Sequence, residues 1–357
     1  MHRFFPPALS TTVRRLGVVA VSCLAVATLA SCGGGTQAKK FSPDSLVVFG
    51  DEFSLVKANG AKYAINSLVT GATVAPPYSC ALHPIWVQYF ANSLGFSFSN
   101  ECTDWPAQPR TAVMLANDPQ DVSINLANPI DAASVASAAT AVTNAGANAV
   151  LTTINNNLGR LNSTTLVTVS VGRADIVQAY QTYLASPDSA TQASLVSMLD
   201  TLGKNFSAGL RPVVQSGARV MLVLSPNLGS SPLAKWDATN LARNEAAMAA
   251  LSKAFNQGVE LGASIAGFTG QQVSLVRLDQ IADVIAANPS TYGLTNVDAT
   301  ACATPAAAAP LCMSDTSSLA ATDADTTYMW SDATHVNTVV QGTMATLVYS
   351  AFTRNPF

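Results

Sequence analysis

The chain has 357 residues, of which 49% are apolar and only 11% are charged. A typical soluble domain carries about 25% charged residues, so uncharged polar side chains must solubilise much of this surface. The net charge is −3 and no basic run occurs, which argues against nucleic-acid binding by charge neutralisation. High apolar content with low charge also argues against a disordered chain and predicts a large buried core.

The N-terminal residues 1–31 have the composition of a secretory signal peptide. Arg14 and Arg15 precede an apolar stretch at 16–30, which is short for a membrane span. The stretch leads into LASC at 29–32, which resembles the lipobox of bacterial lipoproteins and implies that Cys32 is lipidated and becomes the first mature residue. An ordinary signal peptide with a coincidental cysteine is the alternative.

Residues 32–44 then form a flexible tether, and residues 45–357 form a single domain. The tether begins GGGTQAKK after the cysteine, a composition typical of flexible linkers. In bacterial lipoproteins, glycine rather than aspartate after the lipidated cysteine implies transport to the outer membrane. We therefore expect a protein of the bacterial cell envelope that is held to the membrane by its acyl chains.

Four cysteines remain once Cys23 is removed with the signal peptide and Cys32 is lipidated. They form two pairs that are close in sequence, Cys80 with Cys102 and Cys302 with Cys312. Export to an oxidising compartment predicts that each pair is a disulfide. A zinc site is the rival interpretation, but no Cys-x-x-Cys occurs and only His83 and His335 survive processing. We expect no metal and no other cofactor.

Predicted strands and helices alternate along the domain. Short apolar runs rich in β-branched residues predict buried strands at 45–49, 165–171, 219–224 and 272–278. Apolar spacing and composition predict helices at 85–94, ending at Gly95, and at 131–161, 190–214 with a break near Pro212, 234–264 and 337–352. Residues 288–331 form a Pro-, Ala- and Thr-rich excursion. This alternation predicts a parallel sheet with helices on both faces.

In such a sheet, ligands bind outside the carboxyl ends of the strands, so the residues that follow each strand are the candidates. Asp332 and His335 precede the last predicted helix. A carboxylate at this spacing can hold the imidazole Nδ1–H and leave Nε2 free as a base. The G-x-S-x-G, Walker A, G-x-G-x-x-G and H-E-x-x-H motifs do not occur.

Three short blocks follow one another in the order seen in the SGNH/GDSL hydrolases. They are FGDE at 49–52, GRAD at 172–175 and the Asp332–His335 motif. Residues 86–95 and 292–296 are also similar to segments of that family. The resemblance spans about 46–352 and implies a flavodoxin-like, three-layer α/β/α domain of ester-hydrolase ancestry. The residues expected to line its site are Gly50, Asp51, Gly172, Arg173, Ala174 and Asp175.

The sequence departs from the family at the positions that carry the chemistry. Glu52 stands where the family has its nucleophilic serine, and Ala174 stands where an asparagine serves the oxyanion hole. The second-block glycine has no clear counterpart, and 125–129 is the nearest segment. Beside an ionised Glu52, we expect His335 to be a protonated ion-pair partner rather than a base.

Two neighbouring residues have competing interpretations. Ser54 is an alternative nucleophile if the turn is rearranged, although a helix-capping role is favoured. Arg173 could contact an anionic ligand, or it could form a salt bridge with Glu52 or Asp175.

The favoured function is a weakly active or non-catalytic, ligand-binding lipoprotein, with a small ester or lipid as its ligand. The alternative is an active esterase or lysophospholipase that uses Ser54 with His335 and Asp332. A third possibility is a hydrolase with Glu52 as a carboxylate nucleophile, since carboxylates do attack alkyl and glycosyl carbon.

Overall fold

The computed structural model describes residues 40–72, 76–120, 124–303, 312–314, 318–354 and 357. The predicted signal peptide, Cys32 and most of the tether lie outside the described residues. Residues 41–357 form one compact unit. Within the part of the chain that is described, no helix is long and apolar enough to cross a membrane.

A five-stranded parallel sheet forms the centre of this unit. Its strands are β1 (Ser45–Gly50), β4 (Val113–Met114), β5 (Thr165–Ser170), β6 (Arg219–Val223) and β7 (Val273–Val276). The order β4-β1-β5-β6-β7 places the second of these strands outside the first. This is the 2-1-3-4-5 order of flavodoxin-like sheets.

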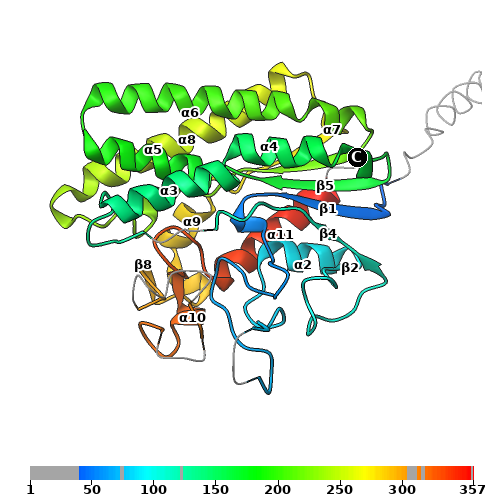
Figure 1. Cartoon of the computed structure of the whole chain (residues 1–357), viewed down its shortest axis with the longest axis horizontal. Helices are drawn as coiled ribbons and strands as arrows, with labels where there is room; N and C mark the ends of the chain where they lie inside the picture. Colours follow the sequence, from blue (N-terminus) through cyan, green and yellow to red (C-terminus); the bar gives the residue numbers. More distant parts are fainter. Residues whose placement is uncertain (1–39, 73–75, 121–123, 304–311, 315–317, 355–356) are drawn as a thin grey trace, which may run out of the picture. The chain divides into compact units, whose positions relative to one another are not determined.

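Helices cover both faces of the sheet (Figure 1). One face carries α3 (Ala132–Ala145), α4 (Ala147–Asn156), α5 (Arg173–Ala185), α6 (Ser189–Gly209), α7 (Arg211–Gln215) and α8 (Leu241–Ile265). The other face carries α2 (Trp86–Ser93) and α11 (Thr338–Arg354). The predicted three-layer α/β/α fold is therefore confirmed, and its central strands β1, β5 and β6 are buried on both faces.

Most predicted elements appear close to their expected positions, with one correction. The predicted helix 234–264 begins only at Leu241, because Asp237 starts a short 3-10 turn (η4, Ala238–Asn240) by accepting a hydrogen bond from the backbone N–H of Thr239. The break in 190–214 falls at Leu210, and Pro212 lies in the first turn of α7, where a missing N–H costs nothing.

Several elements were not predicted. Helix α5 was missed because nearly all of its residues are buried, so it has no polar face to give a helical period. The other elements that were missed are short: β2 (Phe96–Ser97), β3 (Arg110–Thr111), the two-residue strand β4, α9 (Ile281–Ala287), β8 (Asn296–Thr300), α10 (Ala324–Thr327), β9 (Tyr328–Trp330), and the 3-10 helices η1 (Glu52–Ser54), η2 (Leu158–Arg160), η3 (Leu228–Ser230) and η5 (Pro289–Tyr292).

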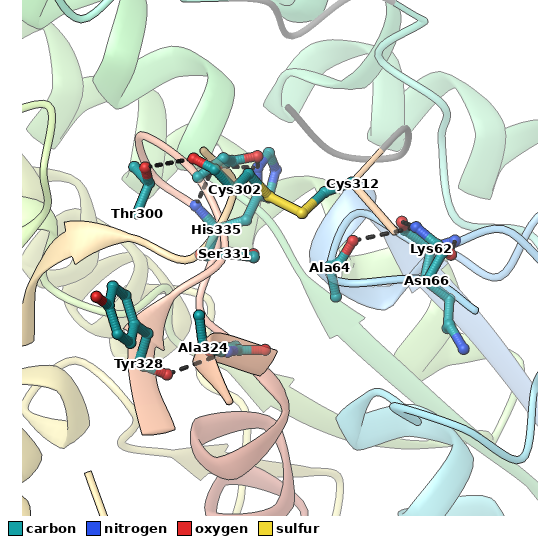
Figure 2. The surroundings of a disulfide bond; sticks show 12 residues. Lys62, Ala64, Asn66, Thr300, Cys302, Cys312, Ala324, Tyr328, Ser331 and His335 are labelled. Carbon is teal, nitrogen blue, oxygen red and sulfur yellow. Dashed lines mark hydrogen bonds and ion pairs between the residues drawn. A yellow bond between two sulfur atoms is a disulfide. The ribbon is translucent and has the colours of Figure 1, made fainter. Parts of the chain in front are cut away.

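Both predicted cysteine pairs are disulfides, with S–S distances of 2.05 Å for Cys80–Cys102 and 2.12 Å for Cys302–Cys312. The second lies between the loop that carries His335 and the segment around Asn66 (Figure 2). The N–H of Asn66 donates to the carbonyl of Cys312 at 2.9 Å, and the N–H of Cys302 donates to the carbonyl of Ser331 at 3.0 Å. Through these backbone hydrogen bonds, the disulfide-linked cysteines connect the segment around Asn66 with the segment around Ser331.

Candidate active site

The candidate site lies at the carboxyl ends of β1 and β5, where the strand order of the sheet reverses. The turn after β1 requires glycine: Gly50 has φ +138°, and a Cβ there would lie 2.2 Å from the carbonyl oxygen of Ser170. The next residue, Asp51, accepts hydrogen bonds from the backbone N–H groups of Phe53 at 3.2 Å and Arg173 at 3.4 Å. Asp51 thus connects the turn after β1 to the first turn of α5.

Glu52 and Arg173 form a buried ion pair, and both residues are 1% exposed. Arg173 donates from Nε to Glu52 Oε1 and from Nη1 to Thr334 Oγ1, the latter at 2.9 Å. Of the alternatives for Arg173, the structure shows the salt bridge with Glu52. The second oxygen of Glu52, Oε2, has no hydrogen-bond partner among the described residues.

Asp332 holds the ring of His335. The imidazole Nδ1 lies 2.8 Å and 3.0 Å from the two carboxylate oxygens, and the backbone N–H groups of Thr334 and His335 also donate to Oδ1 of Asp332. The other ring nitrogen, Nε2, lies 3.5 Å from Oε1 of Glu52 but makes no hydrogen bond with any described residue. Glu52, His335 and Asp332 therefore stand in a row, as their positions in the sequence predict.

Burial lowers the pKa of His335; the Asp332 carboxylate opposes this shift, and the Arg173 charge adds to it. Burial thus favours the neutral imidazole, contrary to the expectation of a protonated His335. The cation that pairs with Glu52 is Arg173. With Nδ1–H directed at Asp332, the lone pair on Nε2 faces Glu52.

The other charged groups respond to the same burial. It raises the pKa of Asp51 to about 6, although Arg173 and backbone N–H donors act in the opposite direction. It lowers the pKa of Arg173 to about 10, which leaves the guanidinium charged at neutral pH. For Asp332, burial favours the neutral form, but the interaction with His335 and the backbone N–H groups outweigh it and lower the pKa.

Ser54 is the last residue of η1 and is fully buried. The favoured capping role for Ser54 is wrong, because Asp51 is the N-cap of η1. The hydroxyl of Ser54 has no hydrogen-bond partner among the described residues, so the pairing with His335 that a nucleophilic serine needs is not formed.

A segment that we call the cover, residues 55–72, closes the site. Leu55 and Tyr63 from the cover pack with Ala174 and Ala141. The ring of Tyr63 lies 5.6 Å from that of His335, centre to centre, and its hydroxyl donates to Asp118. His335 is 1% exposed, and the space that Ala174 lines is narrow and mainly apolar, with Ser137 and Arg173 as its polar members. No pattern in the sequence indicated Tyr63, because the cover contains no helix or strand and hence no period.

Asp175 and the segment 125–129, which were predicted to belong to the site, make their contacts elsewhere. The carboxylate of Asp175 accepts a hydrogen bond from the N–H of Ala147 at 2.9 Å and so holds the start of α4 rather than facing His335. The segment 125–129 lies at the start of α3, where Asn125 donates to Asp131 at 2.9 Å. The residue beside the end of β1 is Asn117, whose N–H donates to the carbonyl of Gly50 at 2.7 Å.

The described residues contain no cluster of three or more His, Cys, Asp or Glu side chains that could hold a metal ion. What the site offers is a neutral imidazole oriented by one carboxylate and facing another. The Arg173 guanidinium and the Thr334 hydroxyl complete the polar cluster.

No family model and no curated protein matches this sequence. Among solved structures, the chain is similar to LAE5, described as an alpha/beta hydrolase enzyme from the metagenome of Lake Arreo, Spain. The identity is 12% and the TM-score is 0.41, over 88% of this chain and 97% of that one. A similarity at this level supports no inference about activity.

Proposed function

We propose that this protein is a lipid-anchored protein of the bacterial cell envelope whose SGNH/GDSL-hydrolase-like domain is at most weakly active on carboxylic esters and binds a ligand instead. The observation that carries the proposal is the Glu52–Arg173 ion pair. It occupies the position from which a serine hydroxyl would attack, and it leaves His335 with no hydroxyl to deprotonate.

The chemistry of ester hydrolysis explains why this substitution matters. A serine attacks an acyl carbon while a base takes its proton, but a carboxylate is a weak nucleophile toward esters and would form a labile anhydride. The missing oxyanion donor at Ala174 adds a typical loss of about 10²–10³ in turnover. Both features predict hydrolysis close to background.

Ester turnover by the full chain in detergent, with p-nitrophenyl butyrate as substrate, tests the proposal. We expect the wild type to be nearly inert, Glu52→Ser to gain a small activity, and Glu52→Ser/Ala174→Asn to gain up to about 10²–10³ more. Glu52→Gln is the matched control, because it removes the charge without supplying a nucleophile. Rapid wild-type turnover would contradict the proposal.

The alternative function is an active esterase in which Ser54 acts with His335 and Asp332. It is favoured by the intact Asp332–His335 pair and by the unpartnered, buried hydroxyl of Ser54. Wild-type turnover that Ser54→Ala abolishes, together with fluorophosphonate labelling of Ser54, would establish this alternative.

A small ester or lipid is the ligand that we propose. A pocket of about 530 Å³ is lined partly by Leu55, Val56, Met114 and Ala116, with Lys57, Glu101 and Asp118 at charged positions. Apolar walls with a few charged groups suit such a molecule. Calorimetric titration with butyl butyrate tests this, and Met114→Glu should abolish the binding.

The lipid anchor is proposed from the lipobox resemblance at Cys32. Metabolic labelling with an alkyne-bearing fatty acid should mark the wild type, and Cys32→Ala should abolish the label and release the protein from the membrane fraction. Labelling that persists in Cys32→Ala would contradict the assignment.

A further inference from the structure

Two tyrosines are the only strongly exposed aromatic residues in the described part of the chain: Tyr89 is 37% exposed and Tyr349 is 39% exposed. They lie on α2 and α11, the helices that cover the same face of the sheet (Figure 1). The ring of Tyr89 adjoins α11 at Gly342, since a Cβ there would lie 3.9 Å from Cε2 of Tyr89. Tyr349 lies two turns further along the same side of α11. We call the exposed sides of these two helices the α2–α11 face.

The α2–α11 face carries almost no charge. Helix α2 has no charged residue, and the only charged residue of α11 is Arg354 in its last turn. The exposed and half-exposed positions of α11 between 342 and 353 carry Gly, Ala, Ser, Thr, Leu and Tyr, and Leu347 among them is 39% exposed. Helices α3 and α4 also lack charged residues, but they contain no aromatic residue. The α2–α11 face therefore combines exposed tyrosines with an absence of acidic groups.

The chain enters the domain at the edge of this face. Phe41 packs against Phe357 with ring centres 5.8 Å apart, and the ring of Phe357 lies 6.1 Å from that of Phe352 in α11. The ring of Phe352 in turn lies 6.2 Å from that of Phe90 in α2. The direction toward Cys32 therefore starts beside the C-terminal end of α11.

The length of chain between this point and the proposed anchor limits how far the domain can stand from a membrane. Eight residues separate Cys32 from Phe41, and even a fully extended chain of this length spans at most about 30 Å. Helix α11 has 17 residues and is thus about 25 Å long. A lipid on Cys32 would keep the end of α11 within roughly one helix length of the bilayer, so the surface beside this end meets the headgroups first.

We propose that the α2–α11 face rests on the lipid bilayer in which Cys32 is anchored, an inference that rests on the lipid anchor of the proposed function. Tyrosine suits the headgroup region because its ring is apolar and its hydroxyl is polar. A face without carboxylates is not repelled by anionic headgroups, and Arg354 at its end attracts them. Because the anchor already holds the domain at the surface, the contact needs little affinity of its own.

Fluorescence quenching by lipids that are brominated on their acyl chains tests this contact. Thr346→Cys places a thiol in the middle of the face, and Met198→Cys places one on α6, on the opposite side of the sheet, where Met198 is 48% exposed. The full lipidated chain is labelled with bimane at either thiol and reconstituted into phosphatidylcholine–phosphatidylglycerol vesicles. We expect the brominated lipid to quench the label at 346 and to leave the label at 198 unchanged. Equal quenching at both positions, or none at 346, would overturn the proposal.

Variants of the face test which side chains make the contact. Tyr89→Ser/Tyr349→Ser should abolish quenching of the label at 346, whereas Leu241→Ser, which removes a 39% exposed residue of α8, should leave it unchanged. Ser350→Glu, one turn from the label, should also abolish it, because a carboxylate would then face the headgroups. Circular dichroism must show that the variants are folded. Quenching that persists in a folded Ser350→Glu chain would contradict the proposed contact.

The outcomes separate this inference from the proposed lipid anchor. If Cys32 carries no lipid, fatty-acid labelling fails and both proposals are wrong. If the lipid is present but the label at 346 is not quenched, only the docking of this face is wrong. A second copy of the chain is the other candidate occupant: a dimer in detergent that Ser350→Glu dissociates, measured by light scattering, would assign the face to self-association and overturn the proposal.

Discussion

The sheet and residues 60–67 of the cover are both buried, but they are stabilised in different ways. In β1 and β5 the backbone groups pair between strands, and most side chains are apolar, with small hydroxyl residues among them. In the cover, buried polar side chains bind the backbone instead. Lys62 donates from Nζ to the carbonyls of Ser79 at 2.7 Å and Leu82 at 2.9 Å, and Asn66 accepts from the N–H of Lys62 at 2.9 Å. Apolar burial needs no particular partner, whereas each of these contacts needs a specific one.

The buried side chains of Lys62 and Arg173 show how the two kinds of environment affect the pKa of a cation. Burial lowers the pKa of Lys62 to about 7 and that of Arg173 to about 10. Arg173 contacts the carboxylate of Glu52, and its guanidinium is always the harder group to deprotonate. Lys62 is bonded to carbonyl dipoles, so its ammonium is close to losing its proton at neutral pH. The stability of the cover should therefore depend on pH near neutrality, a range in which Arg173 stays protonated.

We expect the largest loss of stability from a substitution at the end of strand β1. Gly50→Ala would place a Cβ 2.2 Å from the carbonyl oxygen of Ser170 at a backbone φ of +138°, and we expect it to lower the free energy of unfolding by about 3 kcal/mol or more. Gly71→Ala in the cover is the control. It has φ +89° but no atom within 4 Å of the added Cβ, so only about 1 kcal/mol of backbone strain should follow. If urea denaturation shows that both variants lose the same free energy of unfolding, the comparison is contradicted.

Removing the Cys302–Cys312 disulfide should loosen the cover and leave the sheet protected. On the chain-entropy model, a loop with a sequence separation of 10 accounts for roughly 2.5–3 kcal/mol. In Cys302→Ser/Cys312→Ser, hydrogen exchange should accelerate around Asn66, whose N–H is bonded to Cys312, while the amides of β5 keep their protection. If β5 exchanges as fast as the cover, the two regions do not unfold separately.

We expect the smallest effect from the pH dependence of stability that Lys62 causes. Its pKa is about 7 in the folded chain, against an ordinary value of 10.5, so between these values the unfolded chain binds a proton that the folded chain does not. The free energy of unfolding should therefore rise with pH over this window, by at most about 1.4 kcal/mol per pH unit. Lys62→Met should remove this contribution. Lys57→Met, which removes a partly exposed lysine of the cover, is the control and should keep the wild-type slope in urea denaturation at pH 7.5 and 8.5.

The order of elements could be predicted from the sequence wherever periodicity was strong. Apolar runs located β1, β5, β6 and β7, and the amphipathic pattern located α2. Strand β4 was missed because its sheet pairing covers only two residues, too few to show a period. Helix α5 was missed because it is buried on all sides. The first element is too short to show a pattern, and the second lacks the polar face that only a surface provides.

For the site, the sequence identified which residues follow the strands, because strand ends carry recognisable turns such as Gly50-Asp51. It could not assign the protonation of His335, since that depends on how much water burial removes and on Arg173. Thr334 lies within the Asp332–His335 motif, but its role as an acceptor for Arg173 depends on two loops meeting.

The sequence by itself determined the layers, the cysteine pairing and the row of Glu52, His335 and Asp332, because local pattern and chain order specify a parallel sheet and the ends of its strands. Only the tertiary structure decided that Arg173 is the partner of Glu52, that the imidazole is neutral and that Tyr63 covers it. These features depend on distances between segments more than a hundred residues apart and on the loss of water around them, and neither quantity is encoded in any local pattern.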